Sequence, residues 1–177
     1  MSHKSAIIDF YSLEKADNRN RYLPEIWQKD DHWLEATHDY IQWLFPLKER
    51  SRFNVNAPIL SDEDIQQFRN REYLKINVLK SLSLMLRFYG LALIEDDQTA
   101  NIIIDQSFNH RKKVWVHWGN HNHLRITRIL KSLCLLGLQK YAQALFKCLE
   151  EIYNLEKGEI TNLTFSYWED AVILGDS

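Results

Sequence analysis

Cysteine, glycine and proline are scarce in this sequence of 177 residues, and each shortage argues against a class of structure. The two cysteines, Cys134 and Cys148, stand within helical patterns, so a disulfide framework is not indicated and a reducing cytoplasm is expected. Five glycines and three prolines provide little turn chemistry. Long helices joined by few loops are therefore expected.

A long apolar run is also missing. The most apolar stretch, residues 82–94, contains Arg87 and is too short to cross a bilayer, so it predicts a buried helix. The N-terminus has neither a long apolar core nor a small-residue cleavage site, and no secretion signal is expected. Together these absences predict a soluble, cytoplasmic protein without a transmembrane segment.

Acidic residues are absent between Asp105 and Glu150. This span carries eight lysines and arginines and four histidines, whereas the rest of the chain has a formal charge of −10. Such asymmetry is typical of a basic surface that binds an anionic partner. In the alternative and preferred interpretation, acidic segments of the same chain cover the basic span, because charged stripes on helices are commonly complemented internally.

Apolar residues make up 45% of the chain. Their helical spacing predicts an all-α fold, a single compact domain of about six or seven helices around two buried central helices, 71–94 and 121–136. Residues 1–22 are expected to form a partly irregular N-terminal segment, and residues 23–177 the helical domain. Residues 101–104 would suit a strand, but no partner strand is evident, so no strand is expected there. The other expected helices lie at 31–45, from 61, at 109–118, at 138–154 and from 161.

Several helix ends can be placed from capping residues. A short helix is expected near residues 5–13, and Pro24 suits the first turn of another helix. Ser61 can cap the helix that follows it, and Thr161 or Asn162 can cap the last helix. Gly137 is expected to end the 121–136 helix.

Three histidines lie close together in the sequence, namely His117, His121 and His123. Zinc needs further ligands, yet neither HExxH nor CxxC occurs, and the surrounding span has no carboxylate. A glycine-asparagine pair also breaks the helical register between the histidines. No metal and no cofactor are therefore expected, and Asn120 or Asn122 is expected to cap the helix that follows.

Arg125 and Arg128 lie opposite the apolar stripe of the 121–136 helix, beside Leu124 and Leu135. A half-buried guanidinium needs a carboxylate or another anion. Two such groups one turn apart could hold the carboxylate or phosphate of a ligand. The preferred alternative is internal pairing with an acidic residue, for which the candidates are Glu35, Asp39 and Glu169.

Nucleic-acid binding through the basic 111–147 span is a further hypothesis, since this span interleaves cations with Trp115 and Trp118. The near-neutral pI and the absence of a helix-turn-helix or RNA-binding signature argue against it.

Enzyme chemistry finds little support, because the sequence contains no P-loop, no GxGxxG and no GxSxG motif. The two cysteines lie in apolar helical patterns, where a thiol is usually inert. A catalytic cluster of His38, Asp39, His121 and Arg125 is kept only as a third hypothesis, since no nucleophile can be assigned.

Three sequence blocks resemble a known family. They are HDYIQWLFPL at residues 38–47, LMLRFYG at 84–90 and HNHLRITRILK at 121–131. In this order and at this spacing they resemble the N-terminal conserved region of the opioid growth factor receptor family, in which the third block has a second asparagine where this chain has His123. The resemblance implies an all-α domain that, in animal members, is associated with the nucleus, lacks established catalytic residues and binds an enkephalin. Since no C-terminal repeat region or nuclear-localisation cluster follows, a short stand-alone member is expected.

The leading hypothesis from the sequence is thus a non-enzymatic, receptor-like domain that binds a small peptide or another anionic ligand. Its site is expected where the end of the 38–46 helix meets the start of the 121–136 helix. Aromatic side chains would form its walls, and arginines would bind an anionic group such as a peptide carboxylate. The candidate ligand-binding residues are His38, Tyr40, Gln42, Trp43, Phe45, His121, Asn122, Arg125 and Arg128.

Overall fold

The computed structural model describes residues 5–176, and 59% of these residues are helical. The described residues form ten α-helices, a terminal 3-10 helix and one two-stranded hairpin. The chain divides into two compact units, Met1–Leu84 (unit 1) and Met85–Ser177 (unit 2), with the boundary inside helix α6. The predicted helical class is therefore confirmed for the bulk of the fold, while the hairpin and the number of helices differ from the prediction.

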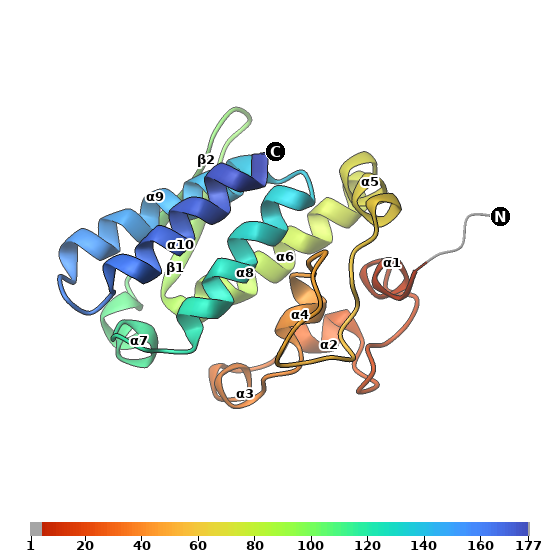
Figure 1. Cartoon of the computed structure of the whole chain (residues 1–177), viewed down its shortest axis with the longest axis horizontal. Helices are drawn as coiled ribbons and strands as arrows, with labels where there is room; N and C mark the ends of the chain where they lie inside the picture. Colours follow the sequence, from red (N-terminus) through yellow and green to blue (C-terminus); the bar gives the residue numbers. More distant parts are fainter. Residues whose placement is uncertain (1–4, 177) are drawn as a thin grey trace. The chain divides into compact units, whose positions relative to one another are not determined.

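Unit 1 is built largely from short helices with well-defined first turns. Ser5 Oγ accepts from the Ile8 N–H at the start of α1, and Ser61 Oγ accepts from the Asp64 N–H at the start of α5. Pro24 occupies the first turn of α2. The predictions of these three starts are confirmed. The helices of unit 1 are α1 (Ala6–Tyr11), α2 (Leu23–Trp27), α3 (Asp31–Ala36), α4 (Ile41–Leu44), α5 (Asp62–Asn70) and the first part of α6 (Glu72–Tyr89) (Figure 1).

The core of unit 1 contains a buried chain of hydrogen bonds around Tyr11. The Tyr11 hydroxyl donates to the carbonyl of Leu44 and lies 3.0 Å from Ser81 Oγ, which accepts from Trp27 Nε1 at 3.0 Å. Because a hydroxyl has one hydrogen and a carbonyl only accepts, Ser81 must donate to Tyr11 in this chain. Asn77 Nδ2 donates to the Tyr11 carbonyl oxygen at 2.8 Å. Four helices of unit 1 are thereby joined through one polar chain.

In unit 2, helices α8, α9 and α10 pack side by side, and strand β2 lies against α9 (Figure 1). Gly137 follows α8 with a φ of +82°, and the Leu138 N–H bonds back to the Leu133 carbonyl, which confirms the predicted C-terminal cap. Thr161 Oγ1 accepts from the Thr164 N–H at the start of α10, as predicted. After the end of α6, unit 2 comprises β1 (Leu91–Glu95), β2 (Ala100–Ile104), α7 (Phe108–Trp115), α8 (Asn122–Leu135), α9 (Gln139–Leu155), α10 (Asn162–Ile173) and the 3-10 helix η1 (Leu174–Asp176).

The β-hairpin contradicts the expectation that residues 101–104 are not a strand. Helix α6 ends at Tyr89 rather than Ile94, because Gly90 adopts a φ of +81°. Strand β1 then pairs antiparallel with β2, in the register Leu91 with Ile104. The partner strand is hidden from sequence inspection because its apolar residues continue the pattern of the preceding helix. Asp96 closes the turn, because its side chain accepts hydrogen bonds from the backbone N–H groups of Gln98 and Thr99.

The prediction of one continuous helix over residues 31–45 is also wrong. This segment forms two short helices, α3 and α4, separated at Thr37–Tyr40. Thr37 is extended, with φ −100° and ψ 133°, and the Asp39 carbonyl accepts from Asn54 Nδ2 instead of continuing a helical ladder. This break adds one helix, and together with the short helices α1 and α2 it brings the number to ten within residues 5–176, above the predicted six or seven.

Candidate functional site

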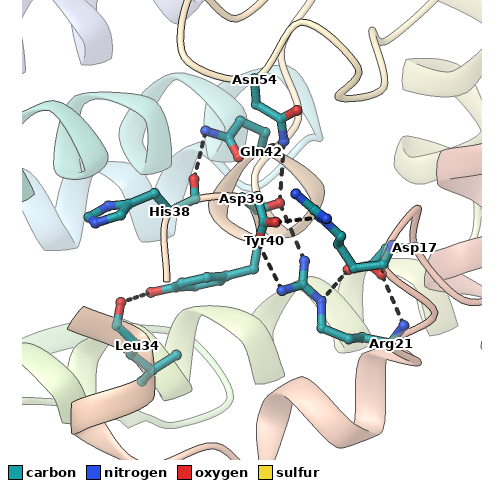
Figure 2. A network of polar contacts seen from close by, with 9 residues as sticks. Asp17, Arg21, Leu34, His38, Asp39, Tyr40, Gln42 and Asn54 are labelled. Carbon is teal, nitrogen blue, oxygen red and sulfur yellow. Dashed lines mark hydrogen bonds and ion pairs between the residues drawn. The ribbon is translucent and has the colours of Figure 1, made fainter. Parts of the chain in front are cut away.

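The break between α3 and α4 carries a charged network in unit 1 (Figure 2). The two carboxylate oxygens of Asp39 accept from Arg21 Nη1 and Arg19 Nε, each at 2.9 Å. Arg21 Nε donates to the buried Asp17 at 2.8 Å, and Asp17 also accepts from the backbone N–H groups of both arginines. Two segments of chain, residues 17–21 and the break at Asp39, are therefore joined by alternating charges, which is the arrangement of a structural tie.

The charge state of Asp39 follows from these neighbours. Burial would raise the pKa of Asp39, but the hydrogen bonds and charges of Arg21, and then of Arg19, outweigh burial and hold the pKa below its usual value. Asp39 is thus a carboxylate engaged by two guanidinium groups, and the geometry gives it no proton to exchange with a substrate near neutral pH. The catalytic cluster proposed for His38 and Asp39 gains no support from this geometry.

Four of the five candidate ligand residues in unit 1 are buried, and His38 is exposed. The Tyr40 hydroxyl donates to the Leu34 carbonyl at 2.8 Å (Figure 2), and Trp43 meets the ring of Phe10 edge-on. Gln42 Nε2 donates to the His38 carbonyl at 3.3 Å. The predicted aromatic walls, which also include Phe45, are therefore core residues of unit 1.

One buried donor among these residues is unsatisfied. Within residues 5–176, Trp43 Nε1 has no hydrogen-bond acceptor although the side chain is only 5% exposed. A buried polar group in this state carries a desolvation penalty on the order of 1–3 kcal/mol. The indole of Trp43 is thus held by its packing rather than by its polar atom.

In unit 2, the turn between α7 and α8 is organised by Asn120. Its Nδ2 donates to the Val114 carbonyl and its Oδ1 accepts from the Asn122 N–H, both at 2.9 Å. The prediction that an asparagine bonds the first free N–H of the 121–136 helix is confirmed for Asn120, although the N-cap position itself is occupied by His121. The Asn120 side chain joins the last turn of α7 to the first turn of α8. The turn between them displays Trp118, which is 72% exposed.

His123 belongs to the core of unit 2 and not to a surface cluster of histidines. Its ring is buried and lies edge-on to the rings of Trp115 and Trp168. Burial lowers the pKa of His123, and the hydrogen bond to the Trp115 carbonyl only partly offsets this effect. Within the described part of the chain, no three His, Cys, Asp or Glu side chains are placed to hold a metal ion.

The remaining candidate residues lie on α8 or just before it. Asn122 and Arg125 are buried, and Asn122 Oδ1 lies 3.5 Å from both Arg125 Nη1 and the Tyr89 hydroxyl. Arg128 is half-buried, His121 is exposed, and both arginines make further contacts within the protein. The nine candidate residues are thus divided between the two units. Their assembly into one ligand site stays a prediction.

Helix α8 has one exposed face, which we call the α8 surface. Residues 121, 124, 128 and 131 follow each other at intervals of three or four, so their side chains share one side of the helix. Leu124 is 58% exposed, and Lys131 is exposed and forms no ion pair with any described residue. With the exposed indole that precedes the helix, the α8 surface consists of Trp118, His121, Leu124, Arg128 and Lys131.

From the sequence, Trp118 is a candidate only for contact with nucleic acid, and neither Leu124 nor Lys131 is assigned to a site. A helical wheel finds the shared face of α8, but exposure depends on which faces the neighbouring helices cover. Internal compensation of the basic span is confirmed at two positions, since Lys112 bonds Glu156 at 2.6 Å and Lys140 lies 3.6 Å from Glu95.

The two cysteines of the chain lie in the interior. Cys134 and Cys148 are buried and are not joined in a disulfide, and burial raises the pKa of the Cys148 thiol to about 12. A thiol in this state is a poor nucleophile near neutral pH. No helix among the described residues is long and apolar enough to cross a membrane.

Comparison with known proteins identifies relatives over most of the chain. Residues 4–174 match the family described as the opioid growth factor receptor conserved region. The opioid growth factor receptor of Mus musculus is 37% identical over 144 residues, covering 79% of this chain and 22% of that protein. The human receptor is 36% identical over 139 residues, covering 73% of this chain and 20% of that protein.

A second group of relatives carries a different name. The opioid growth factor receptor-like protein 1 of Mus musculus is 37% identical over 129 residues, covering 71% of this chain and 27% of that protein. The chain thus spans about a fifth to a quarter of the length of the curated relatives it matches. No solved structure matches it. These relatives confirm the resemblance inferred from the three sequence blocks.

Proposed function

Because the chain belongs to the opioid growth factor receptor conserved-region family, we propose that it is a non-enzymatic domain that binds a short peptide. The relatives are named as receptors for a growth factor, and we propose a receptor-like binding role for this chain as well. Since the chain spans only part of those proteins, the ligand is argued from the surface of this chain. The α8 surface in unit 2 is the feature that carries the proposal.

The α8 surface combines the three kinds of contact that a short peptide needs. The exposed indole of Trp118 offers a face for an aromatic or apolar side chain, and Leu124 extends this apolar contact along the helix. Lys131 supplies a cation at the far end of the surface for a terminal carboxylate. His121 and Arg128 add positive or hydrogen-bonding groups between these ends.

The dimensions of the α8 surface suit a peptide of about five residues. The rise of an α-helix separates residue 121 from residue 131 by about 15 Å along the axis. A five-residue extended peptide spans roughly 17 Å. A peptide with an aromatic side chain near its N-terminus and a free carboxylate at its C-terminus would therefore contact Trp118 and Lys131 together. Enkephalin, the ligand that the family resemblance implies, has this composition.

The proposal is tested by isothermal titration of the full chain with an enkephalin and with its C-terminal amide. We expect binding of the free acid, weaker binding of the amide, and a loss of affinity of roughly tenfold or more in Trp118→Ala, since a buried aromatic contact contributes about 1.5–3 kcal/mol. Lys131→Ala should remove the preference for the free acid.

Matched controls are available on other helices. Leu163→Ala removes a leucine of α10 that is as exposed as Leu124, and Lys147→Ala removes an exposed lysine of α9. Neither change should alter the titration. Unchanged heats in Trp118→Ala, Leu124→Ala and Lys131→Ala would remove the α8 surface from the proposal, and unchanged heats in Arg128→Ala would remove the anion-binding role of that arginine.

A second candidate function, the binding of a polyanion such as single-stranded nucleic acid, draws support from the same unit. Lys113, Lys131 and Lys147 are exposed in a span without acidic residues, and Trp118 could stack on a base. Gel shifts on mixed-sequence RNA and DNA at low and moderate salt decide between the two candidates. Binding through phosphates must weaken steeply with salt.

A further inference from the structure

The loop between α4 and α5 is held firmly at its base. The Leu60 N–H donates to the Leu47 carbonyl at 2.9 Å and closes the loop. Inside it, the buried Ser51 Oγ accepts from the backbone N–H groups of Phe53 and Asn54, each at 3.2 Å. Loops of this length whose ends lie together are compact Ω-loops, and these often carry function. We call residues 48–59 the Phe53 loop.

Asn54 ties the middle of the Phe53 loop to the charged network. Its Nδ2 donates to the Asp39 carbonyl at 3.3 Å and to Gln42 Oε1 at 3.4 Å (Figure 2). The side chain of the neighbouring Phe53 is nevertheless 82% exposed, and Val55 is 60% exposed. An ordered loop therefore presents large apolar side chains to water, and packing within the chain does not account for them.

Cations accompany these apolar side chains. Arg50 and Arg52 are exposed next to Phe53, and within the described part of the chain neither arginine forms an ion pair. Lys48 pairs with Asp62 at 2.8 Å at the base of the loop. With Glu49 as its acidic residue, the Phe53 loop has a formal charge of +2.

We propose that the Phe53 loop binds the surface of an anionic lipid bilayer. Phe53, Val55 and the partly exposed Ile59 would enter the boundary between headgroups and acyl chains, where apolar side chains are stabilised. Arg50 and Arg52 would lie against the lipid phosphates and anionic headgroups. This surface lies in unit 1, whereas the α8 surface lies in unit 2.

The composition of the loop favours a lipid layer over other anionic partners. A nucleic-acid base would stack on the ring of Phe53, but the aliphatic Val55 and Ile59 have no π face to offer it. None of the three side chains carries a polar atom that would need a hydrogen-bond partner in an acyl layer. A fluid layer accepts all three shapes together, whereas a protein pocket would have to match each one.

Cosedimentation of the full chain with vesicles tests the proposal. We expect binding to vesicles of phosphatidylcholine with phosphatidylserine and little binding to phosphatidylcholine alone. Phe53→Ala should weaken binding about tenfold, since burying a large apolar side chain contributes this much or more. Each of Arg50→Gln and Arg52→Gln should weaken binding to the anionic vesicles roughly fivefold. Added salt should reduce the difference in binding between wild type and these two variants.

Two controls keep the result specific. Ile76→Ala removes an exposed apolar side chain of α6, and it should leave vesicle binding unchanged. Phe53→Trp should retain binding, because tryptophan is favoured at the membrane interface. The proposal is overturned if wild-type protein does not sediment with anionic vesicles, if Phe53→Ala binds as well as wild type, or if Phe53→Ala weakens RNA binding and not vesicle binding.

Discussion

His123 Nε2 lies 2.8 Å from the carbonyl oxygen of Trp115 and so joins the start of α8 to the end of α7. A carbonyl oxygen can only accept, so the hydrogen of the neutral imidazole must lie on Nε2. The same histidine accepts at its backbone carbonyl from Trp168 Nε1 at 3.1 Å, which adds α10 to the contact. One buried residue, through its ring and its backbone carbonyl, thereby connects three helices of unit 2.

The burial of His123 predicts a loss of stability in mild acid. Its pKa is lowered in the folded state, so below the unfolded value of about 6.5 the unfolded chain binds a proton that the folded chain refuses. The free energy of unfolding should therefore be constant above that pH. As the pH is lowered further, it should fall until the pH reaches the pKa of His123 in the folded state. Urea unfolding of wild type and His123→Gln across this range measures the effect. The variant can keep the bond to Trp115 but does not titrate, so an equal fall in both proteins contradicts the assignment.

Removing the charge of Asp39 should destabilise unit 1. Asp39→Asn weakens two charge-assisted hydrogen bonds, from Arg19 and Arg21, and we expect a loss of about 1–3 kcal/mol after allowing for its partial exposure. Since the folded pKa is lowered, this contribution is present above the unfolded value near 3.8 and is lost as the pH falls through the folded pKa. Chemical unfolding at neutral and acidic pH measures both. Glu150→Gln, at an exposed carboxylate, is the matched control. Equal and small losses in the free energy of unfolding in both variants would contradict a stabilising role for the bonds of Asp39 to the two arginines.

The hydroxyl of Tyr11 should contribute to stability through its position in a buried chain of bonds. Tyr11→Phe leaves the Leu44 carbonyl and Ser81 without this partner, and we expect a loss of about 1–3 kcal/mol in the free energy of unfolding. Ser81→Ala should have a similar effect, and the double variant should cost less than the sum. Denaturant titration of the three variants tests this, with the exposed Tyr167→Phe as control. Strict additivity would show that the bonds do not act as one chain.

Alanine substitutions at Gly90 and Gly119 distinguish the cost of backbone strain from the cost of steric overlap. Both glycines have a positive φ, +81° and +76°, but a Cβ on Gly90 would lie 2.6 Å from Phe108 Cα, whereas the described residues leave open space around Gly119. Gly119→Ala should therefore cost about 1 kcal/mol, from the backbone alone. Gly90→Ala should cost more than about 2 kcal/mol, since backbone atoms must move. Thermal unfolding of the two variants provides the comparison, and equal losses would contradict the close approach of α7 to the end of α6.

Local signals in the sequence predict the helix ends well. Ser5, Ser61, Thr161 and Gly137 act within one turn of their own position, so their effects are visible from a few neighbouring residues. The break between α3 and α4 depends on Asp39 meeting arginines about twenty residues earlier, which no local window contains. Hairpin pairing and side-chain exposure are likewise tertiary properties.

The candidate site follows the same division. The sequence identifies His121, Arg125 and Arg128 as polar residues of one helix, and the structure places all three on or beside α8. The sequence alone cannot show that Asn122 and Arg125 are buried while Trp118 and Leu124 are exposed, because burial depends on the packing of other helices. The aromatic residues Tyr40, Trp43 and Phe45 illustrate the same point, since their side chains serve the core.

The most direct test of the proposed function is a map of the peptide contact along the chain. Backbone amide signals of the isotope-labelled full chain would be followed by NMR during titration with an enkephalin that has a free carboxylate. The α8 surface predicts that the largest shifts fall on residues 117–131 and disappear in Trp118→Ala, while the signals of unit 1 change little. Shifts confined to unit 1, or no shifts at saturating peptide, would contradict peptide binding on α8.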